Sequence, residues 1–126
     1  MKILICEDEE ILMTAIELRL QKQGFELMKA KSGKIALEKL EKEMPDLCVC
    51  DVKSADISGL ELTNYIRRVM KSTIPVILIG SLEDEELLLE GAGQGADDFI
   101  IKPFKPAELI IRIKRIFQKT AASQAV

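Results

Sequence analysis

The sequence predicts an α/β fold: a single three-layer, doubly wound domain in which a five-stranded parallel sheet lies between two layers of helices. Two observations support this prediction. Five short apolar runs rich in Val and Ile recur along the chain, and the segments between them carry apolar residues at helical spacing. Strict alternation of strand and helix makes the strands parallel, joined by right-handed crossovers. The 126 residues are enough for one such domain but not for a second.

The five predicted strands are short and apolar on both of their alternating faces. They cover residues 2–6 (KILIC), 25–30 (FELMKA), 47–50 (LCVC), 75–79 (PVILI) and 98–101 (DFII). Strands that are apolar on both faces are typical of a parallel sheet covered by helices on either side.

Each of four predicted helices carries one apolar stripe. The stripes are Leu12, Ile16 and Leu20; Ala36, Leu37 and Leu40; Leu62, Ile66 and Val69; and Leu109, Ile113, Ile116 and Phe117. The last helix is expected to run from Pro106, since proline is tolerated at a helix start, to about Gln118. Residues 1–118 would then form the domain, and residues 119–126 a tail or linker.

The helix after the fourth strand has a clear start and a weak end. It opens with Ser81 and Asp84, which fit a capping box. It ends in Gly91, Gly93 and Gly95, and each Gly inside a helix costs about 1 kcal/mol relative to Ala. We therefore expect the least stable helix of the domain here.

Charge, hydropathy and cysteine content predict what the domain does not bind, where it is located and in which state its thiols are. The 18 basic and 21 acidic residues give a net charge of −3 without a block of like charge, so we expect no direct binding to nucleic acid. No segment approaches the roughly 20 apolar residues that cross a membrane, and no signal peptide is evident, so the expected location is the cytoplasm. Cys6, Cys48 and Cys50 are expected to be buried and reduced; a redox-sensitive Cys48/Cys50 pair is the alternative.

Charged residues follow several of the predicted strands at the point where each ends. Glu7 and Asp8 follow the first strand, Asp51 the third and Lys102 the fifth. Ligands of doubly wound sheets bind outside the carboxyl ends of the strands, so these side chains are expected to converge there. A carboxylate cluster without His or Cys is typical of Mg²⁺ sites, and a carboxylate beside Mg²⁺ and a lysine can attack a phosphoryl group. Asp51 is therefore a candidate phosphoryl acceptor; the alternative is that these residues only cap helices and turns.

Four segments together resemble a known family. They are ILICEDEE at 3–10, PDLCVCD at 45–51, Gly59 and DDFIIKPF at 97–104. In their order, spacing and predicted context they resemble the receiver domain of response regulators, over residues 2 to about 118. The resemblance implies a flavodoxin-like sheet of strand order 2-1-3-4-5. It also implies a signalling phosphoacceptor and not an enzyme, apart from self-catalysed phosphotransfer.

The resemblance assigns roles to the residues at the carboxyl edge. It implies that Asp51 accepts a phosphoryl group from a phosphohistidine of a sensor histidine kinase or phosphotransfer protein. Glu7, Asp8 and Asp51 would hold Mg²⁺ as the cofactor, with the backbone carbonyl of Lys53 as a further ligand. Lys102 would contact the acyl phosphate.

The sequence departs from the family where phosphorylation is coupled to the surface. The Thr or Ser that the family places after the fourth strand is Gly80 here, so a side-chain link from the phosphoryl group is missing. Ser81 could supply a hydroxyl to the phosphoryl group instead, or serve as a helix N-cap. Phe99 occupies the position of the family's switch aromatic, either as a switch or as a core residue.

Two more departures flank the acceptor. The ammonium group of Lys53 could lean over the site or remain in solvent. Leu82 replaces a residue that is often polar in the family. Neither residue is an acid or an amide that could orient an attacking water, so we expect slow loss of the phosphoryl group.

The end of the chain resembles receivers of winged-helix transcription factors, in which charged pairs across the fourth helix, fifth strand and fifth helix hold an active dimer. Asp98, Glu108 and Arg112 fit that pattern. Glu90 stands where a basic residue is expected and would repel Glu108. The resemblance thus leaves a homodimer through this output surface open. Ile110 and Ile111 are expected to be exposed on the last helix.

Two other functions remain as alternatives. A pseudo-receiver would keep the fold and signal through constitutive protein contacts, because Gly80 breaks the expected coupling. An enzyme such as a flavin protein or an aspartate-nucleophile phosphatase would share the layered fold. The chain, however, lacks a Gly-rich phosphate loop after the first strand and has Lys53, not Asp, two residues past Asp51.

Overall fold

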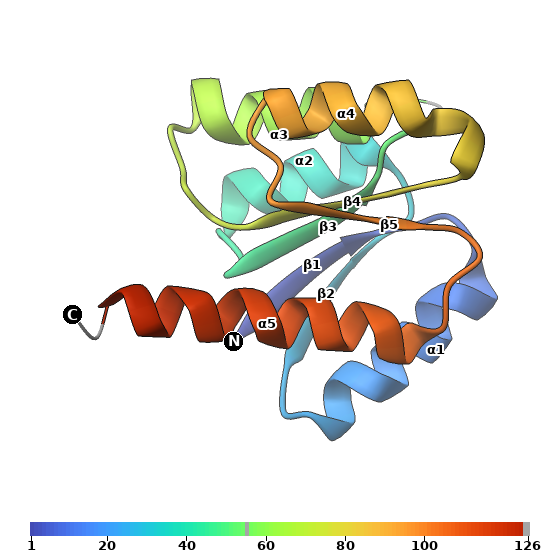
Figure 1. Cartoon of the computed structure of the whole chain (residues 1–126), viewed down its shortest axis with the longest axis vertical. Coiled ribbons are helices and arrows are strands. Elements are labelled where there is room, and N and C mark those ends of the chain that lie inside the picture. Colours follow the sequence, from blue (N-terminus) through green and yellow to red (C-terminus); the bar gives the residue numbers. More distant parts are fainter. Residues whose placement is uncertain (55, 125–126) are drawn as a thin grey trace.

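The computed structural model of the chain describes residues 1–54 and 56–124 (Figure 1). Within these residues five strands alternate with five α-helices, as predicted. The strands are β1 (Lys2–Cys6), β2 (Glu26–Ala30), β3 (Leu47–Asp51), β4 (Val76–Gly80) and β5 (Asp98–Ile101). The helices are α1 (Glu10–Lys22), α2 (Gly33–Lys42), α3 (Gly59–Asn64), α4 (Glu85–Gly93) and α5 (Pro106–Gln124). A π-helical turn, η1 (Tyr65–Val69), follows α3, and a 3₁₀ turn, η2 (Leu82–Asp84), precedes α4.

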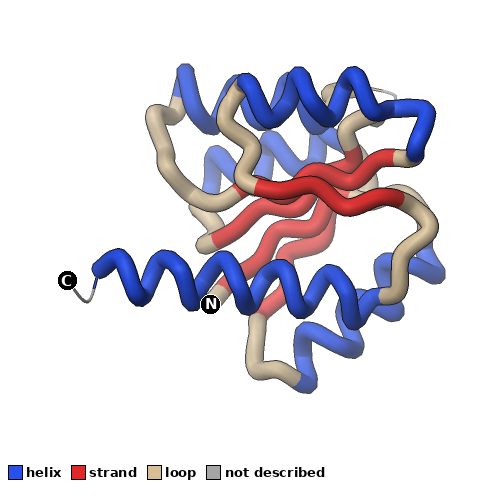
Figure 2. The backbone as a smooth tube through the Cα atoms, in the orientation of Figure 1, coloured by secondary structure: helices blue, strands red, loops and turns tan. Residues whose placement is uncertain are grey.

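All five strands are parallel, and their order in the sheet is β2-β1-β3-β4-β5. Figures 1 and 2 show α1 and α5 on one face of this sheet and α2, α3 and α4 on the other. The predicted three-layer fold and strand order are thereby confirmed. The strand order reverses at β1, so the carboxyl ends of β1 and β3 flank the position where ligands of such sheets bind.

The sheet separates two hydrophobic cores because neighbouring side chains of a strand point to opposite faces. In β1, Ile3 and Ile5 belong to the core beneath α1 and α5. Leu4 and Cys6 belong to the core beneath α2, α3 and α4. The same division holds for the other central strands, which explains why their sequences are apolar without interruption.

The three cysteines are buried free thiols in the second core, as predicted. Cys6 on β1 and Cys50 on β3 are register partners. Burial raises the pKa of the Cys6 thiol to about 12. The neighbouring Cys48 thiol, followed by burial, raises the pKa of Cys50. The Cys6 and Cys50 thiols therefore stay protonated at neutral pH, and they act as small core side chains and not as nucleophiles.

The last helix is longer and more deeply packed than predicted. α5 runs to Gln124 and does not end near Gln118. Residues 119–124 of the expected tail or linker are therefore helical, and the rest of that tail lies outside the described residues. Ile110, expected at the surface, is 7% exposed because α5 packs against both the sheet and α1. No helix in the described part of the chain has the length and apolar character that a membrane span requires.

One residue predicted for the third apolar stripe is not buried. Leu62 and Ile66 are buried, as predicted, but Val69 is 62% exposed. Val69 ends the π-helical turn η1, whose residues are wound more widely than in an α-helix. The wider turn rotates Val69 away from the core, a change of period that an α-helical pattern does not predict.

Candidate functional site

Two of the three acids expected at the carboxyl edge of the sheet, Glu7 and Asp51, meet around Lys102. Its Nζ lies 2.9 Å from Glu7 Oε1 and 3.3 Å from Asp51 Oδ2. Glu9 Oε1, to which the sequence assigned no role, lies 3.7 Å away. Lys102 follows β5, and the strand between β5 and β3 ends in Gly80, which has no side chain. The lysine side chain can therefore extend over the end of β4 to the two acids.

Glu7 is the most deeply buried acid of this edge. Its side chain is 0% exposed, and its Oε2 accepts a hydrogen bond from the Glu9 N–H at 3.1 Å. Burial raises the pKa of Glu7, while the Glu9 N–H and the Lys102 ammonium oppose that shift. Oε1 faces the ammonium but accepts no well-aligned hydrogen bond from the residues that the structure describes. A buried carboxylate oxygen in that state favours a cation nearby.

Lys102 supplies a lasting positive charge at the site. Burial by itself would lower the pKa of its ammonium group, since the side chain is only 22% exposed. The carboxylates of Glu7, Asp51 and Glu9 outweigh that effect and raise the pKa above its ordinary value. The ammonium group therefore remains protonated beside Asp51 at neutral pH.

Glu7, Asp8 and Asp51 line one small cavity of about 20 Å³, together with Cys6, Lys31, Lys53 and Ser54. This volume admits about one water molecule or small ion. The Lys53 N–H donates to Asp51 Oδ1 at 2.9 Å, which orients the carboxylate. Among the described residues no three acidic or cysteine side chains are grouped closely enough to hold a metal ion by themselves. Mg²⁺ commonly takes one or two carboxylates and completes its shell with water, so this set of oxygens fits that ion.

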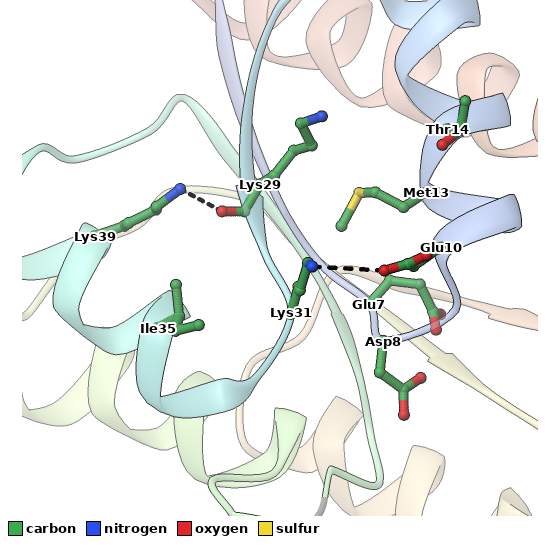
Figure 3. Close-up of a pocket in the computed structure, with 9 residues that line it drawn as sticks. All are labelled: Glu7, Asp8, Glu10, Met13, Thr14, Lys29, Lys31, Ile35 and Lys39. Atoms are coloured by element: carbon green, nitrogen blue, oxygen red, sulfur yellow. Dashed lines mark hydrogen bonds and ion pairs between the residues drawn. The ribbon is translucent and has the colours of Figure 1, made fainter.

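A wider cleft opens beside the same acids, between α1 and α2 (Figure 3). Its volume is about 450 Å³, and Glu7 and Asp8 are part of its lining. Its lysines are engaged by the protein itself: Lys31 Nζ lies 3.5 Å from Glu10 Oε1, and Lys39 donates to the backbone carbonyl of Lys29. The sequence did not predict the cleft because its walls come from separate elements. The cleft leaves the acidic edge accessible from the β2 side of the molecule.

Gly80 ends β4 one residue beyond the register partner of Asp51, and neighbouring side chains fill the space above it. A Cβ on Gly80 would lie 3.0 Å from Val52 Cγ1 and 3.2 and 3.3 Å from the two Cδ atoms of Leu88. Val52 and Leu88 are each 1% exposed. The glycine at position 80 carries no hydroxyl, unlike the family, and its small size allows α4 to pack closely on the end of β4.

Ser81 caps the turn that leads into α4, and the predicted capping box with Asp84 is confirmed. Asp84 Oδ2 accepts hydrogen bonds from the Ser81 N–H at 3.0 Å and from the Ser81 hydroxyl at 2.9 Å. The hydroxyl also lies 3.3 Å from Glu83 Oε1. In this arrangement the Ser81 hydroxyl donates toward η2 and not toward Asp51.

Asp84 is also the partner of the Lys53 side chain, a contact that the sequence did not predict. Lys53 Nζ lies 3.8 Å from Asp84 Oδ1; the side chain of Asp84 is 9% exposed, whereas that of Lys53 is 71% exposed. Hydrogen bonds from Ser81, the backbone N–H first, lower the pKa of Asp84 against the effect of burial, and Lys53 adds to that lowering. Only the capping-box pattern had singled out Asp84. No local pattern pairs it with a lysine from a different loop.

The residues predicted for the output surface lie on α4, β5 and α5. Arg112 Nη1 donates to both carboxylate oxygens of Asp98 at 3.0 Å, which joins α5 to β5 within the chain. Glu90 and Glu108 are exposed. Phe99 is 38% exposed and lines a cavity of about 130 Å³ beside α4. Phe99 is therefore only partly covered, and its role as a switch stays a prediction.

Comparison with known proteins supports the resemblance. A family model described as the response regulator receiver domain matches residues 3–114. The alkaline phosphatase synthesis transcriptional regulatory protein PhoP of Bacillus subtilis is 34% identical, over 94% of this chain and 49% of its own length. The regulatory protein VanR of Enterococcus faecium is 38% identical, over 90% of this chain and 48% of its own length. The chain spans about half the length of these curated relatives.

Solved structures share the same fold. The receiver domain of the Francisella response regulator 1452 matches with a TM-score of 0.84 at 30% identity, over 94% of this chain and 98% of that one. DrrB of Thermotoga maritima, an OmpR/PhoB homologue, matches with a TM-score of 0.83 at 31% identity, over 94% of this chain and 53% of that one.

Proposed function

This chain belongs to the response regulator receiver domain family, and we propose that it accepts a phosphoryl group on Asp51. The observation that carries the proposal is the position of Lys102 Nζ, 2.9 Å from Glu7 and 3.3 Å from Asp51. A fixed cation beside a partly buried carboxylate favours the build-up of negative charge when a phosphoryl group arrives. The proposed outcome is a change in a surface that binds another protein.

The proposed donor is a phosphohistidine of a sensor histidine kinase or phosphotransfer protein. An Asp51 oxygen forms a bond to phosphorus while the phosphorus–nitrogen bond of the donor breaks, and the electron pair of that bond stays on the imidazole nitrogen. The Lys53 N–H holds Asp51 Oδ1 during this step, and the Lys102 ammonium faces the oxygens of the transferred group. The product is an acyl phosphate on Asp51.

The proposed cofactor is Mg²⁺, held by Glu7, Asp8, Asp51 and the Lys53 backbone carbonyl. When bound, the ion neutralises charge on the transferring oxygens and helps to position the donor. The small cavity that these acids share supports this assignment. Ser81 is a further proposed contact of the phosphoryl group, once its hydroxyl turns from Asp84.

The proposed output is transcriptional, because PhoP is named a transcriptional regulatory protein. A homodimer through α4, β5 and α5 is one proposed form of the active state, with no direct contact between this domain and nucleic acid. A kinase-driven signal of this kind is proposed to act in the cytoplasm. The domain would then be a switch whose only chemistry is its own phosphorylation.

A pseudo-receiver is the second candidate, and the packing at Gly80 favours it. Val52 and Leu88 lie within 3.0–3.3 Å of where a Cβ at position 80 would be, which restricts any side chain there. A domain with that packing could bind its partner in the same way with or without phosphate.

Intact-mass spectrometry tests whether Asp51 accepts a phosphoryl group. The wild type is incubated with Mg²⁺ and acetyl phosphate and is expected to gain the mass of one phosphoryl group. Asp51→Asn should gain nothing, while Asp46→Asn, which changes an exposed aspartate away from the site, should react like the wild type. Chelation of Mg²⁺ should abolish the gain. A wild type that stays unmodified would overturn phosphoacceptance and favour the pseudo-receiver.

A further inference from the structure

We propose that the Lys53–Asp84 ion pair replaces the missing hydroxyl at Gly80 and transmits phosphorylation of Asp51 to the start of α4. This inference rests on the proposed function, since it needs a phosphoryl group on Asp51. It concerns a different step, however, namely how the modification reaches the surface.

One end of the ion pair is attached to the acceptor. Lys53 lines the same small cavity as Asp51, and its backbone N–H donates to Asp51 Oδ1 at 2.9 Å. Its ammonium group lies 3.8 Å from Asp84 Oδ1 and belongs to a side chain that is 71% exposed. A side chain that is fixed at its backbone and mobile at its charged end can change partners without a change in the sheet.

The other end of the ion pair is attached to α4. Asp84 uses its Oδ2 atom to accept both the N–H and the hydroxyl of Ser81, which closes the turn η2 before the helix. One turn further along α4, Leu88 packs over Gly80 and against Val52. A change at Asp84 therefore acts on the cap of α4 and on the contact that holds this helix to β4.

Phosphorylation changes the charge that Lys53 meets. A phosphoryl group carries a charge close to −2 at neutral pH, compared with −1 for the carboxylate it modifies. A largely exposed ion pair stabilises a protein by about 1 kcal/mol or less, so its lysine is easily withdrawn. When Lys53 turns to the phosphoryl oxygens, Asp84 Oδ1 is left in a 9% exposed position without its cation. The cap must then rearrange, and α4 loosens from its first turn.

Hydrogen exchange measured by NMR on the phosphorylated full chain tests this inference. In the wild type, phosphorylation should speed amide exchange at Ser81, Asp84 and Glu85 about two- to fivefold, the factor that corresponds to losing one exposed ion pair. Lys53→Met, compared with the wild type at the same phosphate occupancy by intact mass, should show fast exchange at these amides before phosphorylation and no change after it. Lys53→Arg should restore the response. Lys114→Met, at an exposed lysine of α5, should behave like the wild type.

Asp84→Asn provides a second test that leaves Lys53 in place. It retains an oxygen that can accept from Ser81 but removes the charge that attracts the ammonium group, so its response to phosphorylation should also be lost. A wild-type response in phosphorylated Lys53→Met or in phosphorylated Asp84→Asn would overturn the inference while leaving phosphoacceptance intact. A wild type that takes up no phosphate would overturn both.

Discussion

At position 80 a hydrogen atom stands where the family carries a hydroxyl side chain, and the structure shows that the vacated space is filled. Val52 and Leu88 come within 3.0–3.3 Å of where a Cβ would lie. Gly80→Ala should therefore destabilise the domain by about 1–3 kcal/mol through overpacking, measured as a lower urea midpoint. Gly93→Ala is the matched control in α4, because a Cβ there meets nothing within 4 Å. Because Ala also favours a helix over Gly, each variant is compared with the wild type, and a Gly80→Ala midpoint that is not lowered would contradict the packing described.

A second substitution shows which neighbour is responsible. Leu88→Ala should itself destabilise the core, but in its presence the added cost of Gly80→Ala should fall by about 1 kcal/mol, the coupling expected of residues in contact. The measurement is a double-mutant cycle of urea unfolding. Strict additivity would show that Leu88 does not restrict position 80. Restoring the family's Thr at Gly80 therefore requires room to be made for it.

The side chains of Lys53 and Leu82 are expected to set how long a phosphoryl group on Asp51 would last. Leu82 is 77% exposed and cannot bind an attacking water. The phosphorylated wild type should therefore decay slowly, over minutes or longer, and Leu82→Gln should accelerate the decay about tenfold by orienting a water. The measurement is intact mass against time after the donor is removed. A wild-type lifetime of seconds would contradict this prediction.

Among the elements, α2 is tied to the loop after β3 through Asp56. The Asp56 carboxylate accepts the N–H groups of Gly33 and Lys34 at 3.1 Å each, at the start of α2, and the Ser54 hydroxyl at 3.0 Å. The loop can approach the start of α2 this closely because residue 33 is a glycine. A Cβ on Gly33 would lie 1.8 Å from the carbonyl oxygen of Ile57. Asp56→Asn should lower the urea midpoint, since an amide nitrogen cannot accept these bonds. Glu38→Gln, at an exposed residue of α2, is the control for loss of an exposed charge.

The effect of Asp56 should depend on pH. The pKa of Asp56 lies well below its ordinary value, first because of the Ile57 N–H and then that of Lys34. A pKa lowered on folding stabilises the protein above the unfolded pKa of about 3.9, and this contribution is lost as the pH falls toward the folded pKa. The difference in urea midpoint between wild type and Asp56→Asn should thus be full near pH 7 and shrink below about pH 4. A difference that stays constant in acid would contradict this.

The sequence predicts an element well where its own residues carry a clear pattern, such as an unbroken apolar run or a residue that ends a helix. The strands are predicted to within one residue at each end because their apolar runs are buried on both faces, as in β4 (Val76–Gly80). The end of α5 was placed six residues early because no Gly or Pro marks a stop before Gln124. Val69 was predicted to be buried but is exposed, because it lies in a π-helical turn. Ile110 was predicted to be exposed but is buried, because α5 buries more than one stripe of residues.

In the whole molecule, the sheet topology makes the location of the site predictable, but it does not make the partners of individual side chains predictable. Parallel strands bring their carboxyl ends to one edge of the sheet. Glu7, Asp51 and Lys102 each follow such an end, so their proximity does not depend on the conformation of the loops. That the Lys53 side chain pairs with Asp84, or that Leu88 fills the space at Gly80, depends on how α4 docks on the sheet. Residues distant in sequence determine that docking, and no local pattern records it.

The proposed dimer can be tested through the charges at its interface. If two chains associate through α4, β5 and α5, Glu90 of each would face an acidic neighbour such as Glu108. Glu90→Lys would convert two symmetry-related repulsions into attractions, which at about 0.5–1 kcal/mol each corresponds to about five- to thirtyfold tighter association. Sedimentation of the phosphorylated chain measures this, with Glu86→Lys, an exposed residue of the first turn of α4, as control. Equal effects of the two substitutions would contradict pairing at Glu90.

The central claim is that Asp51 carries the phosphoryl group, and identifying the modified residue tests it most directly. Sodium borohydride reduces an acyl phosphate to an alcohol and would convert a phosphorylated Asp51 to homoserine. The chain is treated with acetyl phosphate and Mg²⁺, reduced, digested and sequenced by mass spectrometry. Homoserine is expected at position 51 and at no other aspartate. Homoserine at a different position, or phosphate uptake that leaves Asp51 unreduced, would contradict the claim.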